Sequence, residues 1–486
     1  YVINVKRLSY IFIIRSIYYP DFIIQFHQIL NSMKNLRNFL VFLAILVSWQ
    51  SLAFSQNQDS LSTVCNVKGA RYIHDWNQMI ANITMLDGFS PAVSKRNCSY
   101  PNIAAYEAAR VGFSNEYHSL AGQLTGLKET PSPKSGLVYD WRVCAIQAYR
   151  TVVNKMLYRA FLADSMYKAQ IEQIEAEGVP KEVINHSKEY GESVGKHIIV
   201  WLLVDGHTKN QGRPRYNFPR GEDKWEPTPP DFPDPLDPYF RYMRCMVIDS
   251  AAQFRPIAPT PFSKEKGSPF YDQNMQVYIL SKSLTKEQEL MGRYWDDSPI
   301  KNFHEGHFMF NQRQISPGGH WMNIAAIGCK QLDKNMMECL EVYNLVAISM
   351  FDGFINCWDE KYRSNTIRPI TYINRYIDST WKPIFDTPPF PEHTSGHSTI
   401  SACAAQMLTL LLGDKIPFVD NTEVQFGFPI RKFNSFLDAA WEASNSRVYA
   451  GIHYAKACNE GNRVGKELSN YIYNKITLRE RPKPQD

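Results

Sequence analysis

Apolar residues recur every three or four positions along most of the chain, a spacing that predicts amphipathic helices. Val152, Met156 and Ala160, for example, fall on one face of such a helix. The helices predicted in this way lie at 104–121, 141–177, 183–205, 278–293, 323–357, 395–412, 433–445 and 454–474. We find no internal repeat and no convincing series of strands, so the predicted fold class is all-α.

A proline-rich stretch, 213–240, interrupts the helical pattern. Proline at this density predicts an extended loop, either held in place by packing or connecting two domains. We therefore expect an N-terminal helical half at 56–270 and a catalytic helical bundle at 271–486.

The first 55 residues are of a different kind. Residues 1–32 are rich in Ile and Tyr and are interpreted as a non-native upstream segment. Residues 33–55 combine basic residues, a short apolar core and small residues at the end, which predicts a signal peptide cleaved after Ser55. The alternative, a membrane anchor, needs about 20 apolar residues, and this core is shorter. We expect an exported protein, periplasmic or secreted, without a stable membrane span.

The composition argues against two classes of function, nucleic-acid binding and cysteine-bound metal. The hydrophobic content of 44% suits a large core, and 53 basic against 48 acidic residues leave a charge of only +5. Because no long basic run occurs, we expect no nucleic-acid partner. The nine cysteines form no C-x-x-C motif, which argues against a cysteine-bound metal. Oligomeric state and disulfide pairing stay open.

The stretch "FPEHTSGHS", 390–398, precedes an apolar helical pattern that ends at Gly413. Ser395 is a suitable N-cap, so Gly396 and His397 fall in the first turn, where free amides and the helix dipole favour an anion. His397 can exchange protons with that anion. The alternative is a capped helix with a solvated histidine.

Two further segments carry cations in apolar surroundings. Lys361 and Arg368 lie in "KYRSNTIRP", and Arg447 and His453 lie in "SRVYAGIH". Buried cations need an anion to neutralise them, and guanidinium forks with a lysine suit a tetrahedral oxyanion.

These three segments, in this order and spacing, resemble the signature of vanadium-dependent haloperoxidases and of the type 2 phosphatidic acid phosphatase group. The motifs "RYWDDSP", "SPGGHWMNIA" and "FDGFINCWDEKYRSNTIRPITYI" resemble the bacterial haloperoxidase branch, so the similarity covers most of 292–475. The resemblance implies helical bundles, bound vanadate, with phosphate able to occupy the same site, and hydrogen peroxide and a halide as substrates.

The resemblance also implies roles for individual residues. The oxyanion ligands would be Lys361, Arg368, Ser395, Gly396 and Arg447. His453 would be the apical vanadium ligand or, in a phosphatase, the nucleophile that forms a phosphohistidine. His397 would be the acid/base, and Lys361 would also polarise the peroxide during catalysis.

Four more residues are assigned by the same resemblance. Phe390 would line the halide path with His393 nearby, and Asp296 or Asp297 would pair with Arg447. Iodide or bromide is favoured because these halides are easier to oxidise. His320 is interpreted as a loop or cap residue.

One departure from the phosphatase pattern matters. Where that signature has an aspartate four residues after the apical histidine, this chain has Ala457. Such a carboxylate orients the imidazole, and Glu460 or a backbone carbonyl would have to replace it. Two alternatives to the haloperoxidase are therefore kept: an exported acid phosphatase acting on phosphate esters, and a non-catalytic oxyanion-binding protein.

Overall fold

The computed structural model describes residues 36–298, 300–305 and 307–480. The segment 1–32 and the first residues of the predicted signal peptide 33–55 lie outside them. Contacts divide the chain into two compact units, Tyr1–Leu61 and Ser62–Asp486. The predicted boundary between 270 and 271 is not tested by this division and stays a prediction.

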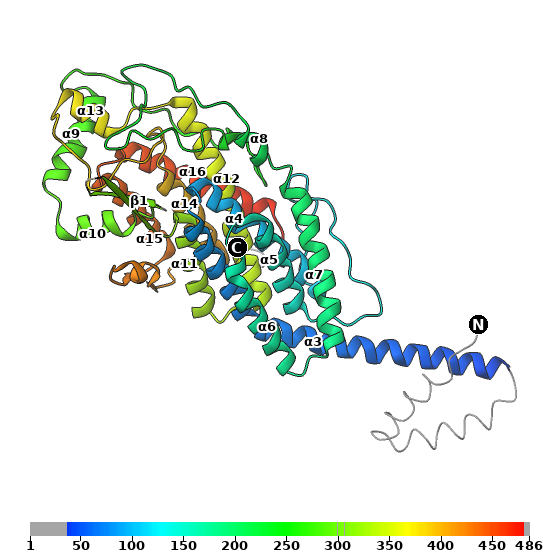
Figure 1. Cartoon of the computed structure of the whole chain (residues 1–486). Helices are drawn as coiled ribbons and strands as arrows, with labels where there is room; N and C mark the ends of the chain where they lie inside the picture. The colour runs from blue at the N-terminus through cyan, green and yellow to red at the C-terminus, as the bar shows by residue number, and fades with distance from the viewer. Residues whose placement is uncertain (1–35, 299, 306, 481–486) are drawn as a thin grey trace, which may run out of the picture. The chain divides into compact units, whose positions relative to one another are not determined.

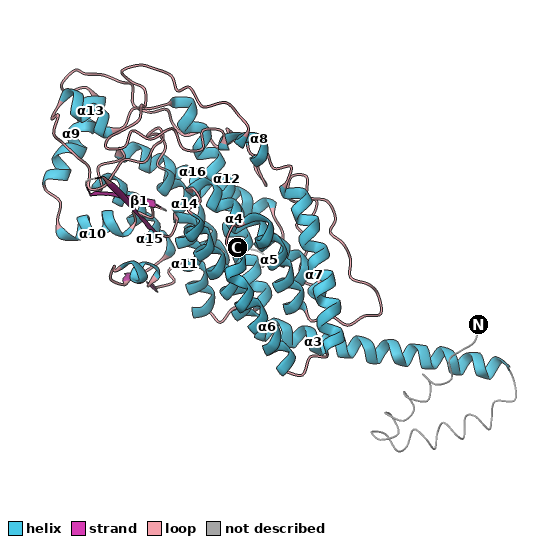
Figure 2. Cartoon of the chain, in the orientation of Figure 1, coloured by secondary structure: helices cyan, strands magenta, loops and turns pink. Residues whose placement is uncertain are grey.

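The described chain is predominantly helical, which confirms the predicted all-α class (Figures 1 and 2). The helices are α3 (Leu36–Asp87), α4 (Pro91–Ala109), α5 (Trp141–Met156), α6 (Asp164–Ala176), α7 (Lys181–Leu202), α8 (His207–Gln211), α9 (Pro269–Lys282), α10 (Lys286–Tyr294), α11 (Pro317–Gln331), α12 (Met336–Ser364), α13 (Pro369–Tyr376), α14 (Gly396–Leu412), α15 (Phe436–Tyr449) and α16 (Ala455–Lys475). Short 3₁₀ helices are η1 (Arg110–Phe113), η2 (Ala160–Ala163), η3 (Phe240–Tyr242) and η4 (Thr422–Phe426).

Three predicted helices are each split in two. The range 278–293 breaks between α9 and α10, where Thr285 forms a capping box. The range 141–177 breaks where Leu157 is extended and Asp87 of α3 accepts hydrogen bonds from the next two backbone amides. The range 323–357 breaks before α12, where Asn335 forms a capping box. Helical periodicity continues across these breaks, so the spacing of apolar residues alone could not locate them.

Two small hairpins were not predicted. Strand β1 (Ile300–Glu305) pairs with β2 (Phe308–Arg313), and β3 (Phe418–Asp420) pairs with β4 (Arg431–Phe433), both antiparallel. The strands are only six and three residues long. An alternation of apolar and polar residues over so short a length cannot be distinguished from the surrounding helical spacing.

The site lies among helices from both predicted halves. Helix α14 packs against α12, α15 and α16, and α4 packs against α12 as well as α5 and α7 (Figure 1). Hydrogen bonds join α4 to α12: Ser99 Oγ donates to Ala347 O (3.2 Å), and Asn344 Nδ2 donates to Asn102 O (3.1 Å). The N-terminal helices therefore form one wall of the bundle that carries the site.

Two glycines let α16 approach the start of α14. A Cβ added at Gly461 would lie 2.9 Å from Ser395 O, and one at Gly465 would lie 2.5 Å from Thr399 O. Since no side chain fits at these distances, glycine at both positions sets the separation of the two helices. This contact fixes the backbone of Ser395.

The proline-rich loop is ordered by packing. Trp225, 1% exposed, donates its backbone N–H to Asn365 O (2.9 Å), and Leu236 donates to Pro389 O (2.9 Å). The loop therefore supports both the end of α12 and the segment that leads into α14.

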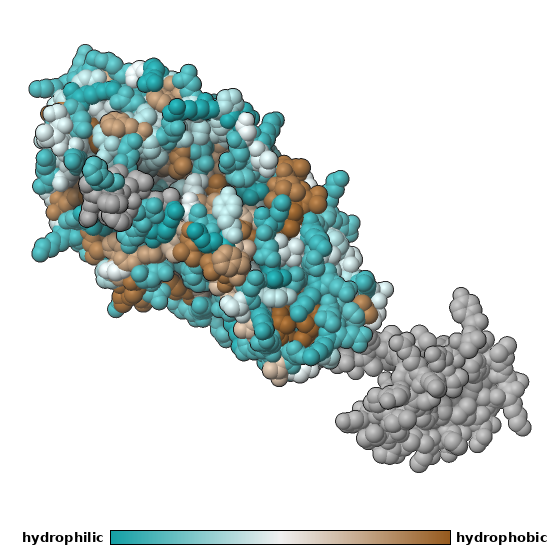
Figure 3. All heavy atoms as spheres, in the orientation of Figure 1, coloured by the Kyte–Doolittle hydropathy of each residue, from teal (hydrophilic) through white to brown (hydrophobic). Residues whose placement is uncertain are grey.

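Figure 3 shows a largely hydrophilic surface on the face in view, with apolar patches scattered over it. Within the described residues, no helix combines the length and apolar character needed to cross a membrane.

The glycine contact between α16 and α14 gives a prediction. Gly465→Ala should lower the free energy of unfolding by about 1–3 kcal/mol, because its Cβ would overlap a backbone carbonyl that cannot move aside. Chemical denaturation measures this change. Gly212→Ala is the matched control: its φ is −84° and its nearest neighbour lies at 3.8 Å, so a change within about 0.5 kcal/mol is expected. Equal losses in the two variants would contradict the proposed packing constraint.

Candidate active site

Ser395 caps α14 as predicted and offers a hydroxyl to a ligand. Its Oγ accepts hydrogen bonds from Ser398 N (3.3 Å) and from Ser398 Oγ (2.8 Å), and Ser444 Oγ donates to Ser398 Oγ (2.8 Å). With two bonds accepted, the Ser395 hydroxyl can donate its own proton to an anion. The residue is fully buried.

Gly396 and His397 follow in the first turn of α14. A Cβ at Gly396 would meet only Trp358 at 3.5 Å and Lys361 Cε at 3.9 Å, so this backbone faces the lysine without obstruction. His397 Nε2 is buried and has no hydrogen-bond partner in the described part of the chain. A buried nitrogen without a partner is costly, and an oxyanion oxygen would satisfy it.

Lys361 and Arg368 are fully buried and lie against the segment before α14. Lys361, in the last turn of α12, donates to Pro391 O (2.9 Å), Glu392 O (3.1 Å) and Thr394 O (2.5 Å). Arg368 Nε donates to the carbonyl of Phe390 (2.8 Å), and its Nη1 donates to that of Ile452 (2.8 Å). The two cations therefore bind backbone carbonyls rather than carboxylates.

Arg447 and His453 are positioned by the end of α15. Arg447 lies in the last turn, where the helix dipole favours a cation, and donates to Trp295 O. Gly451 then adopts φ +79°, which lets the chain leave the helix and bring His453 back toward Arg368. Arg368 Nη1 lies 3.2 Å from His453 Nε2.

The structure therefore brings together all seven residues predicted to bind or process an oxyanion. Within the described residues, none of the three cations, Lys361, Arg368 and Arg447, lies within ion-pair distance of a carboxylate. All three are at most 1% exposed. Three buried, unpaired positive charges favour binding of an anion.

Glu392 fills the role that Ala457 cannot. Its Oε1 lies 2.8 Å from His453 Nδ1 and also accepts from Tyr454 N (3.0 Å). This carboxylate, 1% exposed, keeps the proton on Nδ1 and leaves the Nε2 lone pair toward Arg368. Glu460 instead accepts from Ile257 N and Arg463. The sequence contained Glu392 within the motif, but nothing in its spacing linked it to a histidine 61 residues later.

Burial dominates the acid–base properties of the site. It lowers the pKa of Lys361 to about 7 and that of Arg368 to about 10, and it raises the pKa of Glu392 to about 7. For His453, burial and then the charge of Arg368 hold the pKa well below its usual value. For His397, burial and the charges of Arg447 and Lys95 do the same. Both imidazoles are therefore neutral and can accept a bond from an acid or coordinate a metal.

Phe390 and His393 occupy different environments. The Phe390 ring lies 5.0 Å from Trp358, with Lys361 Nζ 4.9 Å from the Phe390 ring centroid, so it forms part of the wall beside the lysine. His393 is 1% exposed and contacts Ile257 O through Nε2 (3.0 Å), and burial lowers its pKa to about 4. It is therefore not solvated.

Asp296 and Asp297 do not pair directly with Arg447, contrary to expectation. Asp296 binds Lys301 Nζ (2.6 Å), and Asp297 lies 3.1 Å from His320 Nδ1. Their charges still raise the pKa of Arg447, although burial lowers it overall. Each carboxylate has a partner elsewhere, and no motif in the sequence indicated Lys301 or His320 as that partner.

His320 is not a loop or cap residue, so that interpretation was wrong. It lies in the first turns of α11, fully buried, while Ser316 caps the helix. Its ring stacks on Trp295 at 4.6 Å and is bracketed by acidic side chains. Burial alone would lower its pKa, but the charges of Asp297 and Asp420 raise it well above the usual value.

The donors of the site fit vanadate. A neutral imidazole nitrogen at His453, a hydroxyl at Ser395, the N-terminal amides of α14 and three cations are the groups that a tetrahedral oxyanion bound to one nitrogen requires. The unpartnered nitrogens of Arg447 (Nε) and His397 (Nε2) give independent support. Buried Arg447 Nε is open to an acceptor, and buried His397 Nε2, in a neutral ring, is open to a protonated oxygen of the oxyanion.

Comparison with known proteins agrees with this geometry. A family model described as the VCPO second helical-bundle domain matches residues 341–479, which include all seven oxyanion-site residues. No curated protein sequence matches the chain. The crystal structure of a bacterial vanadium-dependent iodoperoxidase is 36% identical, with a TM-score of 0.79, and the match covers 85% of this chain and 98% of that chain.

More distant structures share the fold. The apo form of a bacterial vanadium-dependent chloroperoxidase is 14% identical with a TM-score of 0.59, over 80% of this chain and 95% of that one. A holo form of a bacterial vanadium-dependent chloroperoxidase is 15% identical with a TM-score of 0.57, over 80% and 92%. On the identity and coverage of the iodoperoxidase match, the chain belongs to the vanadium-dependent haloperoxidase family.

Proposed function

We propose that this protein binds vanadate and uses hydrogen peroxide to oxidise a halide, with iodide as the favoured substrate. The observation that carries the proposal is the group of three fully buried cations without carboxylate partners in the described residues. One of them, Arg368, lies 3.2 Å from Nε2 of His453, and the charges of the other two also act on that imidazole. Such a group stabilises a multiply charged oxyanion that also accepts a nitrogen ligand.

Each side chain has a task that follows from its contacts. Lys361, Arg368 and Arg447 disperse the negative charge of the oxyanion, and their burial strengthens this effect. Ser395 Oγ and the amide of Gly396 would donate hydrogen bonds to the oxyanion at the start of α14. His453 Nε2 would be the metal ligand, with Glu392 holding the Nδ1 proton.

His397 is the acid/base of the proposal. Its Nε2 has no protein partner, and its low pKa keeps it neutral, so it can take a proton from incoming hydrogen peroxide and return it to a leaving oxygen. Bound vanadate would supply the Lewis-acidic centre that activates peroxide for two-electron oxidation of the halide.

Iodide is favoured over bromide for two reasons. The match of 36% identity is to an iodoperoxidase, and iodide is the easier of the two to oxidise. Phe390 lies beside Lys361 and Trp358, and we assign this wall to the halide path. A soft, polarisable anion suits such an aromatic surface close to a cation.

A phosphatase activity is the second candidate, and Glu392 is the observation that favours it. A carboxylate on the far nitrogen of His453 makes the near nitrogen more nucleophilic, as formation of a phosphohistidine needs. Because phosphate and vanadate have the same shape and charge, the binding groups would serve both.

Parallel assays distinguish the two activities. The purified protein loaded with vanadate should oxidise iodide in the presence of hydrogen peroxide, and the rate should fall to background without vanadate. The same preparation without vanadate is tested with p-nitrophenyl phosphate. Phosphate ester hydrolysis without peroxide-dependent halide oxidation would overturn the haloperoxidase proposal. His453→Ala should remove the activity, whereas His118→Ala, at an exposed position, should retain it.

Replacing Glu392 tests its contact with His453. Glu392→Gln keeps the side-chain shape but removes the charge that holds the Nδ1 proton, so vanadate should bind about 10–100-fold more weakly. Titration with vanadate measures the dissociation constant, and a melting curve of each variant separates this effect from a loss of folding.

Glu460→Gln is the matched control for that variant. Glu460 contacts Ile257 and Arg463 rather than His453, so its replacement should leave vanadate affinity unchanged. If both variants bind vanadate as the unsubstituted protein does, neither carboxylate positions the imidazole.

Export is a further part of the proposal, supported by the pattern of residues 33–55. Expression of the chain from Met33 in a Gram-negative host should yield a soluble periplasmic protein that begins at Gln56. N-terminal sequencing of that fraction checks the cleavage. Recovery in the membrane fraction with residues 33–55 still attached would favour an anchor instead.

A further inference from the structure

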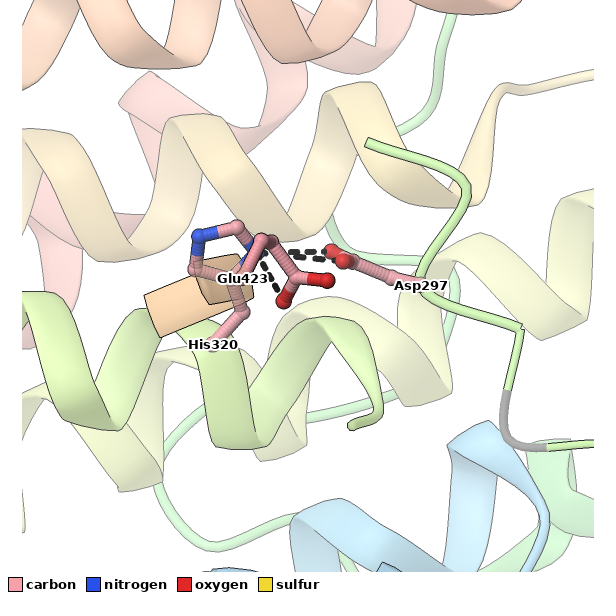
Figure 4. Close-up of side chains that lie close together, drawn as sticks. All are labelled: Asp297, His320 and Glu423. Atoms are coloured by element: carbon pink, nitrogen blue, oxygen red, sulfur yellow. Dashed lines mark hydrogen bonds and ion pairs between the residues drawn. The ribbon is translucent and has the colours of Figure 1, made fainter. Parts of the chain in front are cut away.

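Four buried side chains, three of them acidic, form a cluster around His320, whose ring stacks on Trp295. We call this group the acidic cluster. His320 comes from α11, Glu423 from η4, Asp420 from β3, and Asp297 from the segment before β1. All four are at most 3% exposed. Figure 4 shows Asp297 and Glu423 converging on one edge of the His320 ring.

Three carboxylate oxygens surround His320 Nδ1. Both Asp297 oxygens lie within hydrogen-bond distance of Nδ1, at 3.1 and 3.2 Å, so a single N–H would be shared between them. Glu423 Oε1 lies 3.6 Å from the same nitrogen, which is too far for a hydrogen bond. In a tetrahedral metal site with bonds of about 2.0–2.2 Å, neighbouring donor atoms are separated by about 3.3–3.6 Å. The distances from Nδ1 to Asp297 Oδ2 and to Glu423 Oε1, 3.2 and 3.6 Å, lie close to this range.

Two further observations point to a ligand. Glu423 Oε1 is buried and has no hydrogen-bond partner in the described part of the chain, although it is directed at the cluster. His320 Nε2 lies 2.8 Å from Asp420 Oδ2, the arrangement that fixes the tautomer of a metal-binding histidine through its second nitrogen. With a cation bound in place of the Nδ1 proton, the lone pair of Nδ1 would face the two other carboxylates.

Charge leads to the same conclusion. Three carboxylates and a neutral imidazole would bury three negative charges. Lys301 is already paired with Asp296, and Lys95 and Arg447 act on Asp297 through their charge without an ion pair to it in the described residues. A divalent cation would cancel most of this charge, whereas protons on His320 and one carboxylate are the alternative.

We propose that Asp297, His320 and Glu423 bind a divalent metal ion, with Asp420 orienting the imidazole. One nitrogen and carboxylate oxygens as donors favour Zn²⁺ or Mn²⁺ over Ca²⁺ and Mg²⁺, which prefer oxygen alone. The site is separate from the residues assigned to vanadate and does not depend on the haloperoxidase activity.

Such an ion would brace one wall of the oxyanion site. The His320 ring stacks on Trp295, and Trp295 O accepts the hydrogen bond from Arg447. Fixing His320 and Asp297 therefore fixes the segment that orients the guanidinium.

Metal titration of the purified protein tests the proposal. After removal of metals with a chelator, the protein is titrated with ZnCl₂, MnCl₂, CaCl₂ and MgCl₂ while bound metal and melting temperature are measured. We expect about one equivalent of Zn²⁺ or Mn²⁺ to bind. The melting temperature should rise, because an ion that binds only the folded protein stabilises it against unfolding. Absence of stoichiometric binding by any of the four ions would mean that protons hold the cluster and would overturn the proposal.

Variants identify the ligands. Glu423→Gln should weaken binding by at least about 10-fold, because it replaces a charged ligand with a neutral amide of the same shape. Glu341→Gln removes a buried carboxylate that pairs with Arg479 and should leave metal affinity unchanged. Equal affinity in Glu423→Gln and the unsubstituted protein would place the ion elsewhere, such as at surface histidines.

A spectroscopic measurement covers the case in which Glu423→Gln does not fold. Pulsed electron paramagnetic resonance of Mn²⁺ bound to the unsubstituted protein should show coupling to one imidazole nitrogen. A spectrum without nitrogen coupling would exclude His320 as a ligand and overturn the proposal.

Discussion

The structure of the site depends on burying three positive charges without neutralising them. Lys361, Arg368 and Arg447 are at most 1% exposed, and backbone carbonyls accept their hydrogen bonds. Carbonyl dipoles lower the cost of burial but leave the net charge in place, so the free energy of the site falls further when an anion enters. The ends of α12 and α15 contribute in the same way, because their dipoles favour the cations they carry.

This constraint explains why supporting elements surround the segment before α14. The carbonyls that bind Lys361 belong to residues 391–394, and those that bind Arg368 include residues 388 and 390. The proline-rich loop holds one end of that segment through Leu236, and the close approach of Gly461 fixes the other end at Ser395. Elements far apart in sequence are therefore needed to orient a few carbonyl groups.

The sequence predicted the class of fold, because helical periodicity is a local signal. The seven residues that it named for the oxyanion site lie together in the structure, and their roles, implied by the resemblance, stay predictions. The sequence did not predict the helix breaks at Leu157 and Asn335, which depend on capping and long-range contacts. Nor did it predict the partner of His453. The contact with Glu392 joins residues 61 positions apart, and only the three-dimensional path of the chain brings them together.

The acidic cluster explains how Arg447 stays available. A direct salt bridge with Asp296 or Asp297 would neutralise the guanidinium and occupy the hydrogen-bond donors that an oxyanion needs. Instead Lys301 binds Asp296, and His320 lies against Asp297, so both carboxylates act on Arg447 only through their field. Their charge helps to keep Arg447 protonated despite burial while its Nε has no protein partner in the described chain. Separating the carboxylates from the arginine therefore stabilises a buried cation and preserves its capacity to bind an anion.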